Sequence, residues 1–153
     1  MLAVIATGIV LSVILVSQPS LRQAALPAIR QTPDQNVLLV TLDTLRGDAL
    51  GCYGGRASTP NLDRLASLGV RFDFAHAHGV ITLPAHASIL TGLYPFQHAV
   101  HDNAGFRLAQ SIPTLATTLR AHGVATAAVI SSFALDSRFG LNSGFEVYDE
   151  RYG

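Results

Sequence analysis

The run NVLLVTLDTLRGD, residues 36–48, decides the fold class of this chain. Its first seven residues are almost unbroken apolar and rich in β-branched side chains, which is typical of a strand buried in a parallel sheet. Asp43 follows directly, at the carboxyl end of that strand, where ligands bind in open α/β sheets. Asp43 could equally accept hydrogen bonds in the turn after the strand. The run therefore predicts an α/β domain with Asp43 as a candidate metal- or substrate-binding residue.

Helix and strand patterns alternate along the rest of the chain. Residues 59–69 have the start, spacing and terminal glycine of a helix, and residues 70–75 alternate as a strand. Residues 112–122 predict another helix and residues 124–130 a buried strand, whereas residues 133–148 predict a loop with a short extended end. Right-handed crossovers would lay these strands parallel, with helices on both faces of the sheet.

A second run, TLPAHASILTG at residues 82–92, predicts a short helix. Pro84 suits the first helical turn and Gly92 its end. Thr82 is then placed over the helix N-terminus, where unpaired N–H groups and the helix dipole favour an anion such as phosphate or sulfate. A Thr at this point is also an ordinary N-cap. The run predicts either a capped helix or a nucleophile beside an anion site.

Together these segments resemble the amino-terminal part of the sulfatase family, within the alkaline-phosphatase-like superfamily. The matching runs, in the family's order, are residues 37–48, 51–54, 59–66 and 82–95. The resemblance covers residues 36–153 and implies an alkaline-phosphatase-like α/β fold. It also implies an enzyme, a hydrolase or transferase acting on sulfate or phosphate esters.

The resemblance further implies a divalent metal bound by Asp43 and Thr82, with Thr82 as nucleophile. Metal coordination lowers the pKa of a hydroxyl and screens the charge of the ester under attack. Oxygen ligands suit calcium, magnesium or manganese, and a site supplemented by His suits zinc. Asn103 would aim its amide N–H₂ at a developing oxygen and stabilise the transition state.

Three positions depart from the family pattern. Typical sulfatases carry Cys or Ser at the position of Thr82 and oxidise it to formylglycine, whereas oxidation of Thr would give a ketone. Other branches of the superfamily use an unmodified Thr or Ser to attack phosphorus. His86 stands where sulfatases carry Arg; one helical turn beyond Thr82, it can face the same site and donate a hydrogen bond. Thr44 stands where many have a second Asp, so the metal would lose one anionic ligand.

The amino-terminal residues point to the cell envelope. Residues 1–17 are apolar and uncharged, which predicts a signal peptide or a membrane anchor, although they are short for a span and lack a basic start. Residues 18–35 predict a tether. Residues 36–153 then form the N-terminal part of a sulfatase-like catalytic domain, because family members run several hundred residues and supply further metal ligands later. We expect a truncated chain from a membrane-anchored or exported protein.

Composition narrows the classes of partner. Ten Arg balance ten acidic residues for a net charge of zero, which argues against a nucleic-acid-binding surface. One Cys excludes an internal disulfide, and the oligomeric state is not indicated. Two hypotheses remain: a metal-dependent enzyme acting on sulfate or phosphate esters, or a non-catalytic membrane-tethered module that keeps only the anion-binding helix.

Overall fold

The computed structural model describes residues 35–152. The predicted signal peptide or anchor at residues 1–17, and the predicted tether apart from Gln35, lie outside this range. The chain separates into two units, Met1–Val40 and Thr41–Gly153, and the helices and strands of the described residues belong to the second. None of the helices between residues 35 and 152 has the length and apolar character needed to cross a membrane.

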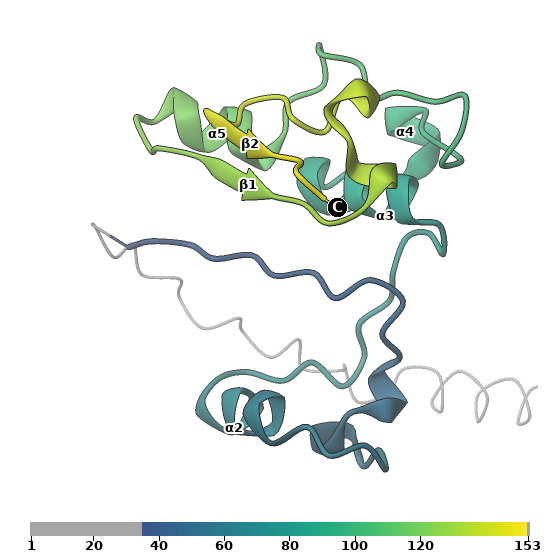
Figure 1. The fold of residues 1–153 in the computed structure, drawn as a ribbon, viewed down its shortest axis with the longest axis vertical. Helices are drawn as coiled ribbons and strands as arrows, with labels where there is room; N and C mark the ends of the chain where they lie inside the picture. Colours follow the sequence, from purple (N-terminus) through teal and green to yellow (C-terminus); the bar gives the residue numbers. More distant parts are fainter. Residues whose placement is uncertain (1–34, 153) are drawn as a thin grey trace, which may run out of the picture. The chain divides into compact units, whose positions relative to one another are not determined.

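Helices and two short strands follow one another along the second unit (Figure 1). The α-helices are α2 (Pro60–Leu68), α3 (Thr82–Thr91), α4 (Pro95–His98) and α5 (Leu115–Ala121). The strands are β1 (Ala127–Val129) and β2 (Val147–Asp149), and the short 3₁₀ helices are η1 (Gly47–Ala49), η2 (Gly51–Tyr53), η3 (Phe133–Leu135) and η4 (Ser137–Phe139). The helices predicted at residues 59–69, 82–92 and 112–122 and the strand predicted at 124–130 are confirmed, each with shorter bounds.

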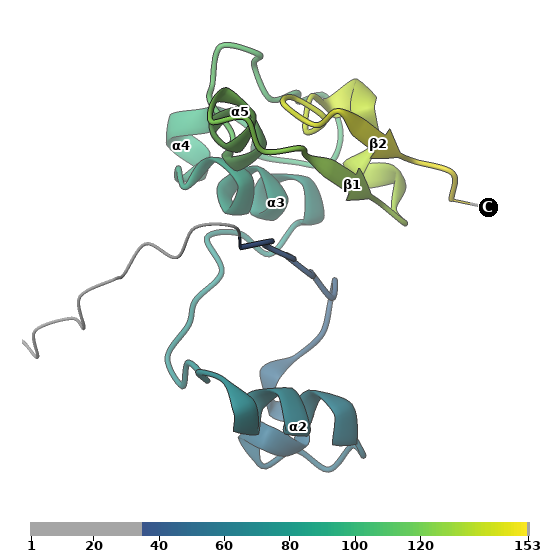
Figure 2. The same cartoon turned by 90° about the vertical axis from the view of Figure 1, so that its left-hand side faces the viewer.

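The two strands pair in parallel, as predicted. Ala127 lies opposite Val147, and Val129 lies opposite Asp149. Helix α3 contacts α4, α5 and η3 (Figure 2). A parallel pair with a helix in the connection is the elementary unit of an α/β fold, although here the segment between β1 and β2 carries 3₁₀ turns.

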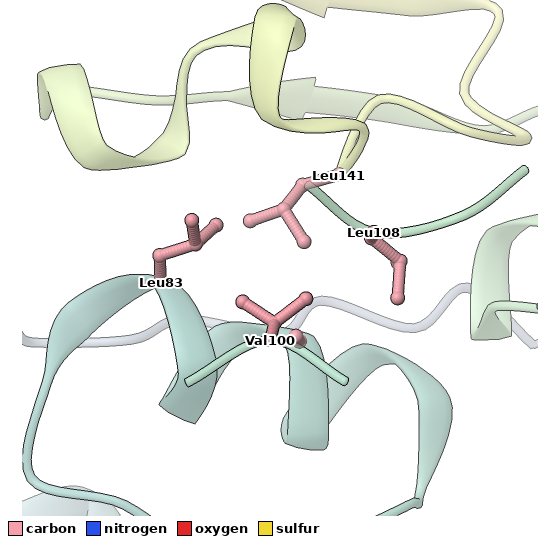
Figure 3. Packing of buried hydrophobic residues seen from close by; sticks show 5 residues of the cluster. Leu83, Val100, Leu108 and Leu141 are labelled. Atoms are coloured by element: carbon pink, nitrogen blue, oxygen red, sulfur yellow. The ribbon is translucent and has the colours of Figure 1, made fainter. Parts of the chain in front are cut away.

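Helix α3 supplies one side of the hydrophobic core. Leu83 and Ala87, one helical turn apart and therefore on one face of α3, are fully buried. They pack with Val100, Leu108 and Leu141, which come from the segments after α4 and η4 (Figure 3). Because Leu83 is the second residue of α3, the core fixes the start of this helix, and Thr82 lies beside it.

The ends of α3 explain its length. Gly92 closes the helix in the left-handed conformation, with φ of 70°, and its N–H donates to the carbonyl of Ser88. At the other end the N-cap position is Ile81, which makes no side-chain cap, and Thr82 is the first helical residue. The alternative that Thr82 is an ordinary N-cap is therefore wrong.

Two predicted strands are absent from the described residues. Residues 35–42 have no regular secondary structure, and Val37 and Leu38 are 75% and 87% exposed. Residues 70–75 are also irregular, and Phe72 and Phe74 are exposed. An apolar run becomes a strand only where neighbouring strands satisfy its backbone groups, and none does so within residues 35–152.

Candidate active site at the start of helix α3

Asp43 and Thr82 meet at the first residue of α3. The hydroxyl of Thr82 donates a hydrogen bond to Asp43 Oδ2 at 3.0 Å. The other carboxylate oxygen accepts the N–H of Thr44 at 3.1 Å, in a turn where Thr44 has φ of 58°. Left-handed backbone is unusual for a β-branched residue and marks a constrained turn. The structure thus brings together the two residues predicted to share a metal, and Asp43 is exposed to solvent.

Asn103 reaches the same helix end from the loop after α4. Its Oδ1 accepts the N–H of Leu83 at 2.8 Å, so Asn103 caps α3 from twenty positions further along the chain. Because an N–H can only donate, the amide oxygen must face the helix, and the N–H₂ group is left to donate elsewhere. This orientation is compatible with the predicted role of Asn103 toward a substrate oxygen.

The cap by Asn103 reduces the number of backbone N–H groups that the start of α3 can donate to an anion. Of the first-turn N–H groups, that of Leu83 is taken by Asn103, and Pro84 has none. The N–H of Ala85 already donates to the carbonyl of Ile81. Among the described residues, the N–H groups of Ile81 and Thr82 remain to meet an anion, which is fewer than the sequence pattern suggested.

Both ring nitrogens of His86 have protein partners. Nδ1 lies 2.8 Å from the carbonyl oxygen of Thr82, one helical turn earlier, and Nε2 lies 3.0 Å from the hydroxyl of Thr41. A carbonyl oxygen only accepts, so Nδ1 carries a proton, and the Thr41 hydroxyl can donate to Nε2 of the neutral ring. The contact of His86 with a substrate stays a prediction, because in this geometry neither nitrogen is free.

Sequence reasoning missed Thr41. The spacing of Thr41 from Asp43 could have revealed it. The two residues are two positions apart, and side chains at that spacing share one face of an extended segment. If Asp43 faces α3, Thr41 faces it as well.

His98 serves the core instead of the site. It is 1% exposed, its Nδ1 accepts the N–H of Val100 at 3.1 Å, and its Nε2 lies 3.0 Å from the hydroxyl of Ser88 on α3. Burial, assisted by the charge of His101, lowers the pKa of His98 below its ordinary value. The neutral side chain of His98 therefore links α4 to α3 through its hydrogen bond with Ser88.

The donor set around Thr82 fits part of a metal site. Asp43 and Thr82 present two oxygen atoms 3.0 Å apart, which is the chemistry that calcium, magnesium and manganese prefer. Within residues 35–152 no group of three or more His, Cys, Asp or Glu side chains converges to hold a metal. A metal bound here needs more ligands than Asp43 and Thr82 supply.

Comparison with known proteins identifies relatives of one family. The profile of the family described as Sulfatase matches residues 35–151. The chain is 37% identical to N-acetylglucosamine-6-O-sulfatase of Bacteroides thetaiotaomicron, over 56% of the chain and 15% of that protein. It is 36% identical to human iduronate 2-sulfatase, over 80% of the chain and 22% of that protein.

Solved structures agree with the sequence relatives. A solved structure in complex with its substrate D-glucosamine-2-N,6-O-disulfate superposes with a TM-score of 0.56 and 32% identity, over 66% of this chain and 20% of that one. A Bacteroides thetaiotaomicron structure assigned to the sulfatases has a TM-score of 0.59 and 28% identity, over 69% of this chain and 23% of that one. The predicted α/β fold class is confirmed. The chain spans between 14% and 24% of the length of the curated relatives it matches.

Proposed function

Because this chain belongs to the sulfatase family, we propose that the protein of which it is part is an enzyme that hydrolyses sulfate esters. Its relatives include proteins named as sulfatases of sugars and of sterols. One structural neighbour holds a sulfated sugar as substrate. The chain covers between 14% and 20% of these proteins by length, so the activity of the whole protein is inferred from this one segment. A non-catalytic module receives no support from these relatives.

We propose Thr82 as the nucleophile. The observation that carries this proposal is the 3.0 Å hydrogen bond from the Thr82 hydroxyl to the Asp43 carboxylate, at the start of a helix fixed by the core. Thr82 Oγ1 would form a bond to the sulfur or phosphorus atom while the bond to the ester oxygen breaks and the alcohol leaves with a proton. Water would then cleave the enzyme ester, release the inorganic anion and restore the hydroxyl.

The identity of the anion is a separate part of the proposal. Family membership favours sulfate. The chemistry of Thr82 favours phosphate, because the methyl group on the β-carbon of Thr makes its oxidation product a ketone and not the formylglycine of typical sulfatases. Phosphate esters, whose phosphoryl group would be transferred to Thr82, are therefore the second substrate class to test.

We propose that a divalent cation is held by Asp43 and Thr82, which supply two oxygen ligands. When bound, such a cation would lower the pKa of the hydroxyl and screen the charge of the ester. The N–H₂ group of Asn103, fixed by the bond of its oxygen to Leu83, would donate to a developing oxygen. The predicted envelope location rests on residues 1–17 alone and is part of the same proposal.

The test is turnover by the full-length protein. Aryl sulfate and aryl phosphate would be offered to the wild type, Thr82→Ala and Thr82→Ser, before and after treatment with a chelator. We expect Thr82→Ala to lose cleavage, Thr82→Ser to keep part of it, and the chelator to abolish it. Thr91→Ala is the matched control, since Thr91 ends the same helix and its hydroxyl bonds only to nearby backbone groups, the carbonyl of Ala87 and the N–H of Leu93. Unchanged cleavage by Thr82→Ala would overturn the nucleophile assignment.

A further inference from the structure

Two hydrogen bonds join the segment around Asp43 to helix α3, and their spacings match. Thr41 bonds to His86, and Asp43 bonds to Thr82. Two residues of extended chain advance about 6.6 Å, and four residues of α-helix advance about 6 Å. Because these lengths are nearly equal, a segment that runs along α3 can make both bonds at once. Residues 41–43 are therefore attached to α3 at two points.

The attachment through His86 is rigid on the helix side. Nδ1–H donates to the Thr82 carbonyl at 2.8 Å within the same helix, which fixes the ring and leaves Nε2 facing Thr41. His86 is half-buried, whereas Thr41 and Asp43 are exposed. The His86 ring is thus held in place by α3, and the exposed segment bonds to it through Thr41.

The bond between Thr41 and His86 matters because the bond between Asp43 and Thr82 is weak on its own. A single exposed hydrogen bond contributes little once water competes for both partners. With Thr82 as its only contact on α3, the carboxylate of Asp43 would swing with its turn, held locally by the N–H of Thr44. A second point of attachment two residues away removes that freedom.

We propose that Thr41 is a positioning residue for the reaction at Thr82: through His86 it holds Asp43 at hydrogen-bonding distance from the Thr82 hydroxyl. This proposal rests on the proposed function of Thr82 as nucleophile. It gives His86 a structural reason to be His, since its two nitrogens join α3 to Thr41.

Kinetics of the full-length protein test the effect on the reaction. Thr41→Val keeps the shape of the side chain but removes the hydroxyl, and Thr41→Ser keeps the hydroxyl. We expect Thr41→Val to lower kcat by about two- to threefold, the lower end of what one lost hydrogen bond is worth, with KM little changed. Thr41→Ser should rescue the rate. The control Thr118→Val removes the hydroxyl of an exposed residue on α5, where it bonds only to the Thr114 carbonyl at the start of that helix, and should behave as the wild type. Equal rates in Thr41→Val and the wild type, or equal losses in Thr41→Val and Thr41→Ser, would overturn the proposal.

A second measurement needs no turnover. With ¹⁵N-labelled His, the ring signals of His86 are assigned by their loss in His86→Gln. We expect an Nδ1–H tautomer in the wild type and a shifted Nε2 signal in Thr41→Val but not in Thr41→Ser. An unchanged Nε2 signal in Thr41→Val would overturn the attachment. If Thr82→Ala stayed active, the nucleophile assignment would fail, and these spectra would still decide whether Thr41 holds His86.

Discussion

Removing the side chain of Asn103 should loosen the start of α3 and slow the reaction. Asn103 Oδ1 accepts the N–H of Leu83 at 2.8 Å, and Leu83 is fully buried. Asn103→Ala leaves that N–H without a partner where water cannot easily reach it. Loss of a helix cap costs about 0.5–2 kcal/mol, and an unsatisfied buried donor costs about 1–3 kcal/mol. We expect the free energy of unfolding to fall by about 1–2 kcal/mol.

Asn103→Asp separates the two roles of this residue. The carboxylate still accepts the N–H of Leu83 and is favoured by the helix dipole, so stability should stay near that of the wild type. It cannot donate, because an ionised carboxyl has no N–H₂ group, so turnover should fall in Asn103→Asp as well as in Asn103→Ala.

Urea unfolding and ester turnover of the full-length protein measure both effects. With a urea dependence of about 2 kcal/mol per molar, the unfolding midpoint of Asn103→Ala should drop by roughly 0.5–1 M. Asn142→Ala changes an exposed Asn and serves as the control. An unchanged midpoint in Asn103→Ala would refute the cap, and wild-type turnover in Asn103→Asp would refute the donor role.

Two further predictions concern the core around α3. The pKa of His98 lies below its ordinary value of about 6.5, so below that pH the unfolded chain binds the proton more readily, and stability should fall as pH drops. Unfolding measured against pH should show this slope in the wild type and lose it in His98→Gln; a wild type that becomes more stable on acidification would contradict the assignment. Gly140→Ala should destabilise the fold by more than Gly123→Ala, measured by thermal unfolding. Both glycines have φ near 80°, at 83° and 78°, but a Cβ at Gly140 would collide with the carbonyl oxygen of Leu108, whereas Gly123 faces open space. Equal losses would refute the role given to close packing.

Local signals in the sequence were enough for the helices. Gly92 ends α3 in the left-handed conformation that the pattern requires, and the helix predicted from residue 59 is α2. These features depend on a few neighbouring residues, so they can be read from the chain alone.

Strands and helix caps were harder to predict from the sequence, because they depend on partners that are distant along the chain. The run at residues 36–42 has the composition of a buried strand but forms no ladder within the described residues. The cap of α3 comes from Asn103, and the partner of His86 is Thr41, far away in sequence. The proximity of Asp43 and Thr82 was implied by family resemblance and is seen in the structure, whereas their chemical roles stay predictions.

The central claim is that Thr82 carries the group removed from the substrate. The most direct measurement is mass spectrometry of the full-length protein, quenched in acid during turnover and digested. The account predicts that the peptide containing Thr82 gains the mass of one sulfuryl or phosphoryl group, at Thr82 itself. A group found on another residue, or continued turnover by Thr82→Ala with no modified peptide, would contradict it.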